Sequence, residues 1–191
     1  MKRAYLGLIG IGIFAYGAYM PIKAQLAQYL IQNAWDKSLA SADVIKPWPW
    51  MDTHPVMRLS SDKHQQDLIV LSGDSGNVLA FAPGHNPQSN KGDTTGTVLI
   101  SAHRDTHFNF LQAVDIGDEF VLETHNGSQN YYQVSEIKII DTKYQEITLS
   151  DTQSELKLST CYPFNTPISG GSLRYIVTAD LLNRQQINHK I

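Results

Sequence analysis

Three residues of this sequence could perform covalent chemistry together: Cys161, His103 and Arg174. Cys161 is the only cysteine, so it is an inert buried thiol, one half of an intermolecular bridge, or a nucleophile. The thiolate is the attacking form of cysteine, and a nearby cation lowers the cost of forming it. His103 could exchange protons with leaving and entering amines, and Arg174 could donate two hydrogen bonds to an oxyanion.

The strand pattern predicts that these three side chains leave the hydrophobic core near the ends of strands. Side chains alternate between the two faces of a strand. In the run 156–161 the leucines share one face and Cys161 falls on the other, while His103 follows the apolar run 98–102. Arg174 lies on the face opposite to the apolar residues beside it. Residue chemistry alone leaves open a packed thiol, a capping histidine and an arginine in a surface ion pair.

The part of the chain after residue 43 reads as a series of short strands, each bounded by Gly, Pro, Asn or Asp. This pattern predicts an antiparallel sandwich or a closed barrel. A short helix is expected after residue 105, with Phe108, Leu111 and Val114 turned inward, and residues 83–87 read as loop. The eight predicted strands are 56–60, 67–71, 78–81, 97–102, 119–124, 131–140, 155–160 and 173–182.

The N-terminus has the pattern of a membrane anchor. Lys2 and Arg3 precede the uncharged stretch 4–22, whose 19 residues approach the about 20 needed to cross a bilayer. We therefore expect an anchor over 1–22 with a cytoplasmic N-terminus, a cleaved signal peptide being the rival. An amphipathic juxtamembrane helix over 23–42 is expected to lie against the domain, which occupies 43–191.

The composition argues against several classes of protein. A net charge of -3 with scattered lysines and arginines offers no basic stripe for nucleic acid. His103 and His107 are four residues apart, but this spacing places two metal ligands on one face only within a helix. No metal site and no cofactor is therefore predicted. Burial of Trp48 and Trp50 in the core is favoured over a lid.

Two motifs and one arginine resemble the sortases, a family of membrane-anchored cysteine transpeptidases. They are Ile100-Ser101-Ala102-His103-Arg104-Asp105-Thr106-His107-Phe108, the strand end Leu158-Ser159-Thr160-Cys161, and Arg174 thirteen residues later. The similarity covers roughly 48–182; Ala102 departs from the glycine that usually precedes the histidine. The segment from Trp48 to Leu59 looks most like the proteobacterial class GN sortases.

The resemblance implies an all-β fold, a closed eight-stranded barrel with one or two short helices behind the anchor. It implies that Cys161 attacks a Thr-Gly-type bond in a C-terminal LPXTG-like sorting signal, with His103 as acid and base and Arg174 as oxyanion or substrate stabiliser. An amine acceptor would then take the acyl group from the thioester. Thr160, Ala102 and Tyr162 are further candidates for substrate contact.

The expected partners are a sorting-signal protein, an amine-bearing acceptor and the bacterial inner membrane, with a periplasmic catalytic domain. Two rivals remain: a thiol endopeptidase of the same fold, and a catalytically silent, membrane-tethered barrel that binds peptides.

Overall fold

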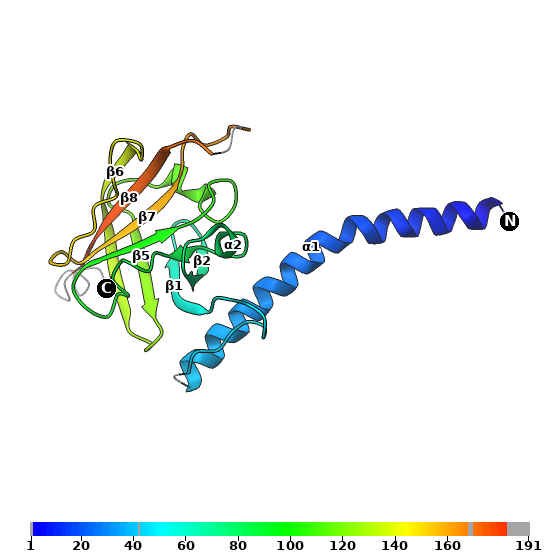
Figure 1. Cartoon of the computed structure of the whole chain (residues 1–191), viewed down its shortest axis with the longest axis horizontal. Coiled ribbons are helices and arrows are strands. Elements are labelled where there is room, and N and C mark those ends of the chain that lie inside the picture. The colour runs from blue at the N-terminus through cyan, green and yellow to red at the C-terminus, as the bar shows by residue number, and fades with distance from the viewer. Residues whose placement is uncertain (1, 42, 168–169, 183–191) are drawn as a thin grey trace.

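In the computed structural model, residues 2–41, 43–167 and 170–182 are described (Figure 1). A long helix, α1 (Lys2–Ser41), precedes a closed barrel of eight strands. The predicted eight-stranded barrel is therefore confirmed. Its strands are β1 (Pro55–Ser61), β2 (Gln66–Ser72), β3 (Gly84–His85), β4 (Thr97–Ser101), β5 (Glu119–Thr124), β6 (Gln129–Asp141), β7 (Glu155–Cys161) and β8 (Leu173–Leu181).

The strands follow one another around the barrel in the order β1-β2-β3-β4-β7-β8-β6-β5. Six of these neighbouring pairs are antiparallel, and the pairs β2–β3 and β4–β7 are parallel. The parallel β4–β7 pair needs a long crossover, because a tight turn can join only antiparallel strands. The crossover contains the short helix η1 (Asn109–Ala113) together with β5 and β6. As a result β7 lies between β4 and β8.

The barrel encloses one hydrophobic core. Alternating residues of β1 and β5 point inward, as the period of two requires. Phe108, Leu111 and Val114, around η1, pack onto this core, and their predicted inward orientation is confirmed. The strands contribute Met57, Leu59, Val70, Val98, Ile100, Phe120, Leu122, Tyr132, Val134, Leu156, Leu158, Val177 and Ala179.

Two local predictions between β2 and β4 were wrong: the strand over 78–81, and the loop over 83–87, which contains β3. Residues 78–81 do not form a strand, because helix α2 (Gly76–Leu79) begins where the Ser75 carbonyl accepts hydrogen bonds from the amides of Val78 and Leu79. A short apolar run does not distinguish the two structures. Strand β3 instead forms at Gly84, where a Cβ atom would lie 2.2 Å from the Gly73 carbonyl oxygen. Only glycine permits this close approach of two backbones.

The C-terminal part of α1 belongs to the folded domain. Ile31 and Trp35 are buried with Leu71 in a second apolar cluster, and the Gln28 side chain donates to the Phe81 carbonyl at 2.6 Å. The expectation that the helix lies against the domain does not hold for its first turns, because Ile22 and Leu26 are 65% and 55% exposed. These turns lie where α1 extends away from the barrel (Figure 1).

Within the described residues, no helix combines the length and apolarity that a membrane crossing requires. The side chains of residues 1–15 and Ala18, most of the predicted anchor, lie outside the described part.

The predicted burial of both Trp48 and Trp50 was also wrong. Trp48 is half-buried, and its ring meets the Phe81 ring edge-on with centroids 5.4 Å apart. Trp50 is 81% exposed. Both line an apolar hollow of about 1020 Å³ between α1 and α2. The tryptophan that is buried completely is Trp35.

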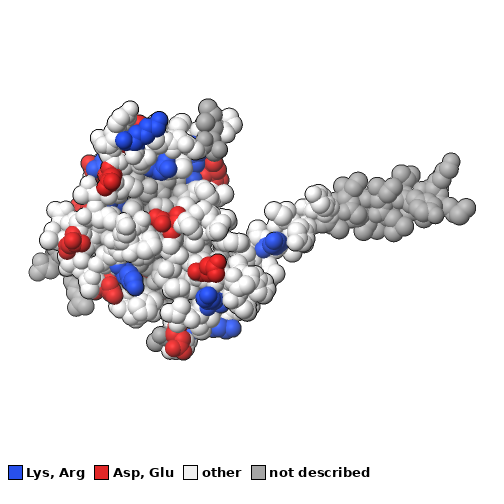
Figure 2. Space-filling view, viewed as in Figure 1, with Lys and Arg blue, Asp and Glu red and all other residues white. Residues whose placement is uncertain are grey.

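Charged side chains are dispersed over the barrel. Figure 2 shows lysines and arginines interspersed with aspartates and glutamates on the face it presents. This distribution agrees with the net charge of -3 and with the absence of a basic stripe in the sequence.

Candidate active site

The first two candidates, Cys161 and Arg174, lie directly opposite one another. Cys161 ends β7 and Arg174 lies near the start of β8, and the two form the last pair of the antiparallel β7–β8 ladder. Directly opposed residues have Cβ atoms about 4.5–5.5 Å apart, so their side chains share a face. The free thiol of Cys161 is partly exposed. A substrate can therefore reach the sulfur beside a cationic side chain.

His103 reaches the same face from the other neighbour of β7. Strand β4 is parallel to β7, with Ser101 paired to Ser159, and the Ala102 amide continues the ladder by donating to the Ser159 carbonyl at 3.2 Å. Two residues beyond that pair, this register places His103 level with Cys161. Neighbouring strands are about 4.8 Å apart. His103 is exposed, so a thiol and an imidazole project from adjacent strand ends.

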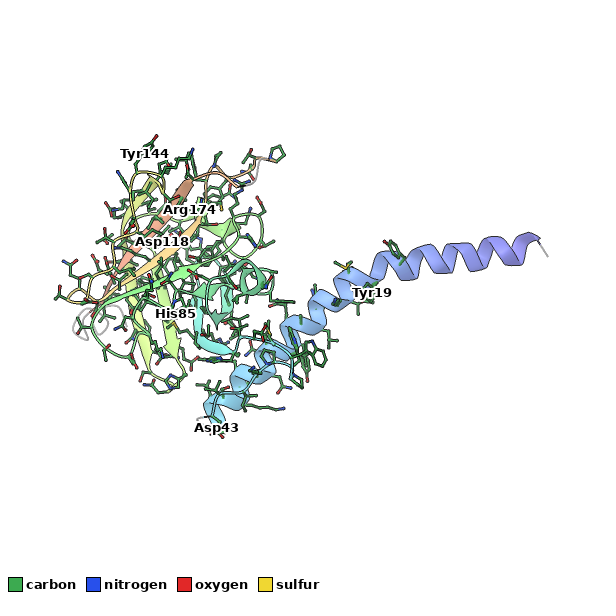
Figure 3. All side chains as sticks on the ribbon, in the orientation of Figure 1. Tyr19, Asp43, His85, Asp118, Tyr144 and Arg174 are labelled. Atoms are coloured by element: carbon green, nitrogen blue, oxygen red, sulfur yellow. The ribbon has the colours of Figure 1, made fainter. Side chains whose placement is uncertain are left out.

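Arg174 is anchored by its own loop. Its Nη1 atom donates to the carbonyls of Gly171 at 2.7 Å and Leu173 at 3.0 Å. Both bonds use the same nitrogen, whereas a guanidinium carries five N–H donors in a planar fork. Figure 3 places Arg174 on β8 near the upper part of the barrel as drawn. These two bonds hold the guanidinium beside the Cys161 end of β7 and use one of its three nitrogens.

A second imidazole, His107, lies near His103. Burial lowers the pKa of His107, and the positive charge that His103 can carry lowers it further. Among the described residues, no group of three or more His, Cys, Asp or Glu side chains could hold a metal ion.

The three other candidates border the trio in different ways. Thr160 and Ala102 are buried, and the Thr160 hydroxyl donates to the Ala102 carbonyl at 2.7 Å. This bond connects the ends of β7 and β4, and the hydroxyl proton is used in it. Tyr162 is half-buried and stacks on Tyr175 with ring centroids 6.2 Å apart. Contact of these three residues with substrate stays a prediction.

Sequence reasoning missed Arg104, the residue after His103. Its side chain is only 7% exposed, and it donates to the carbonyls of Pro163 at 2.7 Å and Thr166 at 3.1 Å. Both acceptors lie in the loop between β7 and β8. The alternation around His103 could have indicated the inward direction of Arg104, because an exposed residue at a strand end leaves both of its neighbours directed inward.

The matched family and its relatives agree with this fold. A model of the sortase domain matches residues 59–182. Sortase D of Bacillus subtilis (strain 168) is 32% identical over 120 residues, which are 62% of this chain and 60% of that protein. The match thus spans less than two thirds of that relative.

Solved structures share the barrel at low sequence identity. A Clostridium perfringens Sortase D5 transpeptidase has a TM-score of 0.66 at 16% identity, over 83% of this chain and 99% of that one. A lid mutant of Sortase A from Corynebacterium diphtheriae has a TM-score of 0.61 at 17% identity, over 90% of this chain and all of that one. At these identities the likeness concerns the fold.

The fold and site thus define a sortase-type barrel with a free cysteine at the end of β7. The chain belongs to the sortase family.

Proposed function

We propose that the protein is a cysteine transpeptidase with Cys161 as its nucleophile. The observation that carries this proposal is the position of Cys161 on β7, between the strand that ends at His103 and the strand that carries Arg174. The three side chains supply a nucleophile, a proton carrier and an oxyanion donor, which are the groups that acyl transfer needs.

The proposed reaction has two acyl transfers. The Cys161 sulfur attacks the carbonyl carbon of the scissile peptide bond, and the oxyanion that forms accepts hydrogen bonds from Arg174. Protonated His103 then gives its proton to the departing amine, and a thioester remains. Neutral His103 next removes a proton from an incoming amine, which attacks the thioester and releases a new amide. The Cys161 thiolate is regenerated, and His103 carries a proton again.

The proposed substrate is a protein with a C-terminal LPXTG-like sorting signal, cut at a Thr-Gly-type bond. The motifs around His103 and Cys161 support this assignment and the amine acceptor through their resemblance to the sortases, and the segment at Trp48 supports the class GN subgroup in the same way. Water in place of the amine would make the same site a thiol endopeptidase.

We also propose that the N-terminal segment holds the enzyme at the bacterial inner membrane with the barrel in the periplasm. The uncharged stretch 4–22 behind Lys2 and Arg3 supports this proposal. So does the apolar surface of α1, which includes Tyr19 on the part of the helix that lies clear of the barrel (Figure 3). The large exposed apolar residues there are Tyr16, Tyr19, Met20, Ile22, Leu26 and Tyr29.

The decisive experiment is a search for an acyl-enzyme. The full chain is incubated with a library of LPXTG-like peptides, and intact mass is compared between wild type and Cys161→Ala. An adduct of thioester size on wild type alone supports the mechanism and gives the cleavage position. Addition of an amine then separates transpeptidation from hydrolysis, because the two products differ in mass.

Two negative results have different meanings. A Cys161 that alkylates quickly yet forms no adduct would exclude this substrate class while leaving an active thiol. A Cys161 that resists alkylation in a folded protein would favour the silent binding barrel.

A further inference from the structure

We infer that Arg104 is a positioning residue, which holds the Cys161 end of β7 and the loop behind it against the His103 end of β4. The inference rests on the proposed function, because it assigns Arg104 a role in the spacing of the reacting groups. Arg104 itself is buried on the side opposite to His103. It therefore acts through the backbone that carries the reacting groups.

The β4–β7 ladder ends before it reaches the proposed reacting residues, His103 and Cys161. The last ladder pair is Ser101 with Ser159. Just beyond it, two hydrogen bonds join the segments that follow the paired residues: the Ala102 amide donates to the Ser159 carbonyl, and the Thr160 hydroxyl donates to the Ala102 carbonyl. These bonds fix the near side of the site. On the far side, the loop after Cys161 is joined to η1 by the bond from Asn165 to Gln112 at 3.0 Å, and the residues next to His103 need a connection of their own.

Arg104 supplies that connection. Its Nη1 and Nη2 atoms donate to the carbonyls of Pro163 at 2.7 Å and Thr166 at 3.1 Å. In the segment that follows β4, the contact at Ala102 lies directly before His103 and the contacts at Arg104 lie directly after it. At the end of β7, the contact at Thr160 likewise lies before Cys161 and the contact at Pro163 lies after it. The relative position of the imidazole and the thiol is therefore fixed from both sides.

The chemistry of the contact requires an arginine. Two nitrogens of one planar fork reach two carbonyls that lie three residues apart, whereas a lysine ammonium is a single point of charge. The Arg104 side chain is 7% exposed, so a lost partner would not be replaced easily by water. Its charge is balanced by Asp105, whose carboxylate accepts from Nε at 3.3 Å and is 65% exposed.

The held loop also leads to the third reacting group. The Tyr162 amide donates to the Leu173 carbonyl at 3.0 Å, and that same carbonyl accepts from Arg174. A shift of the loop at Pro163 would therefore change the positions of Cys161 and Arg174 together. A misplacement of about 1 Å can reduce a rate about a hundredfold.

The test compares Arg104→Lys and Arg104→Gln with the matched control Arg58→Lys. Arg58 also makes a two-pronged contact, to Asp67, but it lies on β1 and is 37% exposed. Well below the unfolding temperature, we expect Arg104→Lys to lower kcat at least about tenfold with KM changed little, because positioning is lost and substrate contacts are kept. The neutral Arg104→Gln should lose as much, and Arg58→Lys nothing.

A second readout does not depend on the substrate. The pH profile of Cys161 alkylation reports the coupling of the thiol to its neighbours, and deuterium exchange over 162–167 reports how firmly the loop is held. Both should change in the two Arg104 variants. If wild type makes no acyl-enzyme, the proposed function fails, and these two measurements alone decide the role of Arg104.

The inference is overturned by folded Arg104 variants that keep wild-type kcat, alkylation profile and exchange. It is also overturned if Arg58→Lys causes the same loss. A fall in the unfolding temperature with unchanged kcat and an unchanged alkylation profile would assign Arg104 a structural role only, and would equally reject the inference.

Discussion

The side chains of Cys161 and Arg174 face each other across the last pair of the β7–β8 ladder. A ladder pair is a rigid way to hold two groups, because the backbone hydrogen bonds of two strands determine their separation. In this site, the guanidinium of Arg174 is carried by the same sheet as Cys161, the proposed nucleophile.

Replacement of Arg174 by lysine tests whether the planar fork is needed. Arg174→Lys keeps the charge, but a single ammonium cannot make the same pair of hydrogen bonds to a developing oxyanion. We expect kcat for acyl transfer to fall about a hundredfold or more, as it does when one oxyanion donor is removed. Steady-state kinetics on the peptide found by mass analysis gives the value. A kcat within about threefold of wild type would reject the role.

Stability should be almost unchanged in that variant. Arg174 is only partly buried, and its bonds go to carbonyls of its own loop. Urea unfolding should give a free energy within about 0.5 kcal/mol of wild type.

Two tryptophans provide a matched pair for testing whether α1 is part of the domain. Trp35 is fully buried between α1 and the barrel, whereas Trp50 is 81% exposed. Trp35→Ala should lower the free energy of unfolding by about 3–5 kcal/mol, because it leaves a large cavity. Trp50→Ala should change it by less than about 0.5 kcal/mol. Urea titrations of both proteins give the comparison, and equal effects would show that α1 is not docked in solution.

The same packing determines where a soluble fragment should begin. A fragment that starts near Ser41 would lack Ile31, Ala34 and Trp35, which are buried. We expect such a fragment to be less stable than one that begins at Lys23.

Much of the fold could be predicted because strands such as β1 and β5 have a clear period of two and the predicted strands are bounded by turn residues. The inward direction of Phe108 and Leu111 followed from the short helix expected after residue 105. The misassigned segment around Val78 has no such signal, since four apolar residues fit a helix or a strand equally well. The short β3 depends on Gly84 meeting a distant backbone, which no local pattern reveals.

The candidate site was accessible from sequence to a similar extent. Alternation indicated that Cys161 and Arg174 leave the core, but only the strand order brings His103 beside them, through a parallel pair between distant segments. Arg104 was missed because a charged residue in a loop-like stretch reads as solvent-exposed. Its burial depends on the path of the loop at Pro163, which is a tertiary property.

Stability should decrease as the pH falls below about 6.5. Burial is the main cause that lowers the pKa of His85 and His107 below the usual 6.5. The unfolded chain therefore binds more protons than the fold in this range, so the free energy of unfolding rises with pH through it. Each such histidine contributes at most about 1.4 kcal/mol per pH unit.

Unfolding in urea between pH 7.5 and pH 5 measures this slope. His85→Gln should flatten the slope, because glutamine does not titrate in this range. The glutamine amide can still donate to the Asn90 carbonyl that His85 contacts at 2.9 Å. An unchanged slope would show that His85 is not the source.

A separate decrease in the free energy of unfolding is expected at lower pH. Burial opposes ionisation of Asp118, yet hydrogen bonds from Lys63, the Asp115 amide and His64 keep its pKa below 3.8. This contribution is present above the unfolded pKa and disappears as the pH falls through the lower folded value.

A buried ion pair on β7 should contribute more to stability than an exposed pair of the same type. Lys157 Nζ lies 2.8 Å from Glu155 Oε1, with the side chains 9% and 10% exposed, and Thr97 also donates to that carboxylate oxygen at 2.6 Å. Lys157→Met leaves the carboxylate buried with one partner, which should cost about 3–5 kcal/mol. Lys138→Met is the control, because Lys138 and Glu136 are 47% and 53% exposed and pair at 2.9 Å.

The control should change the free energy of unfolding by less than about 1 kcal/mol. The double change Lys157→Met with Glu155→Gln should recover part of the loss, because a neutral amide is cheaper to bury than a lone carboxylate. If both lysine variants lose the same amount, or the double variant recovers nothing, burial is not what makes the Lys157 pair important. Urea titrations at pH 7.5 make these comparisons above the range in which His85 and His107 titrate.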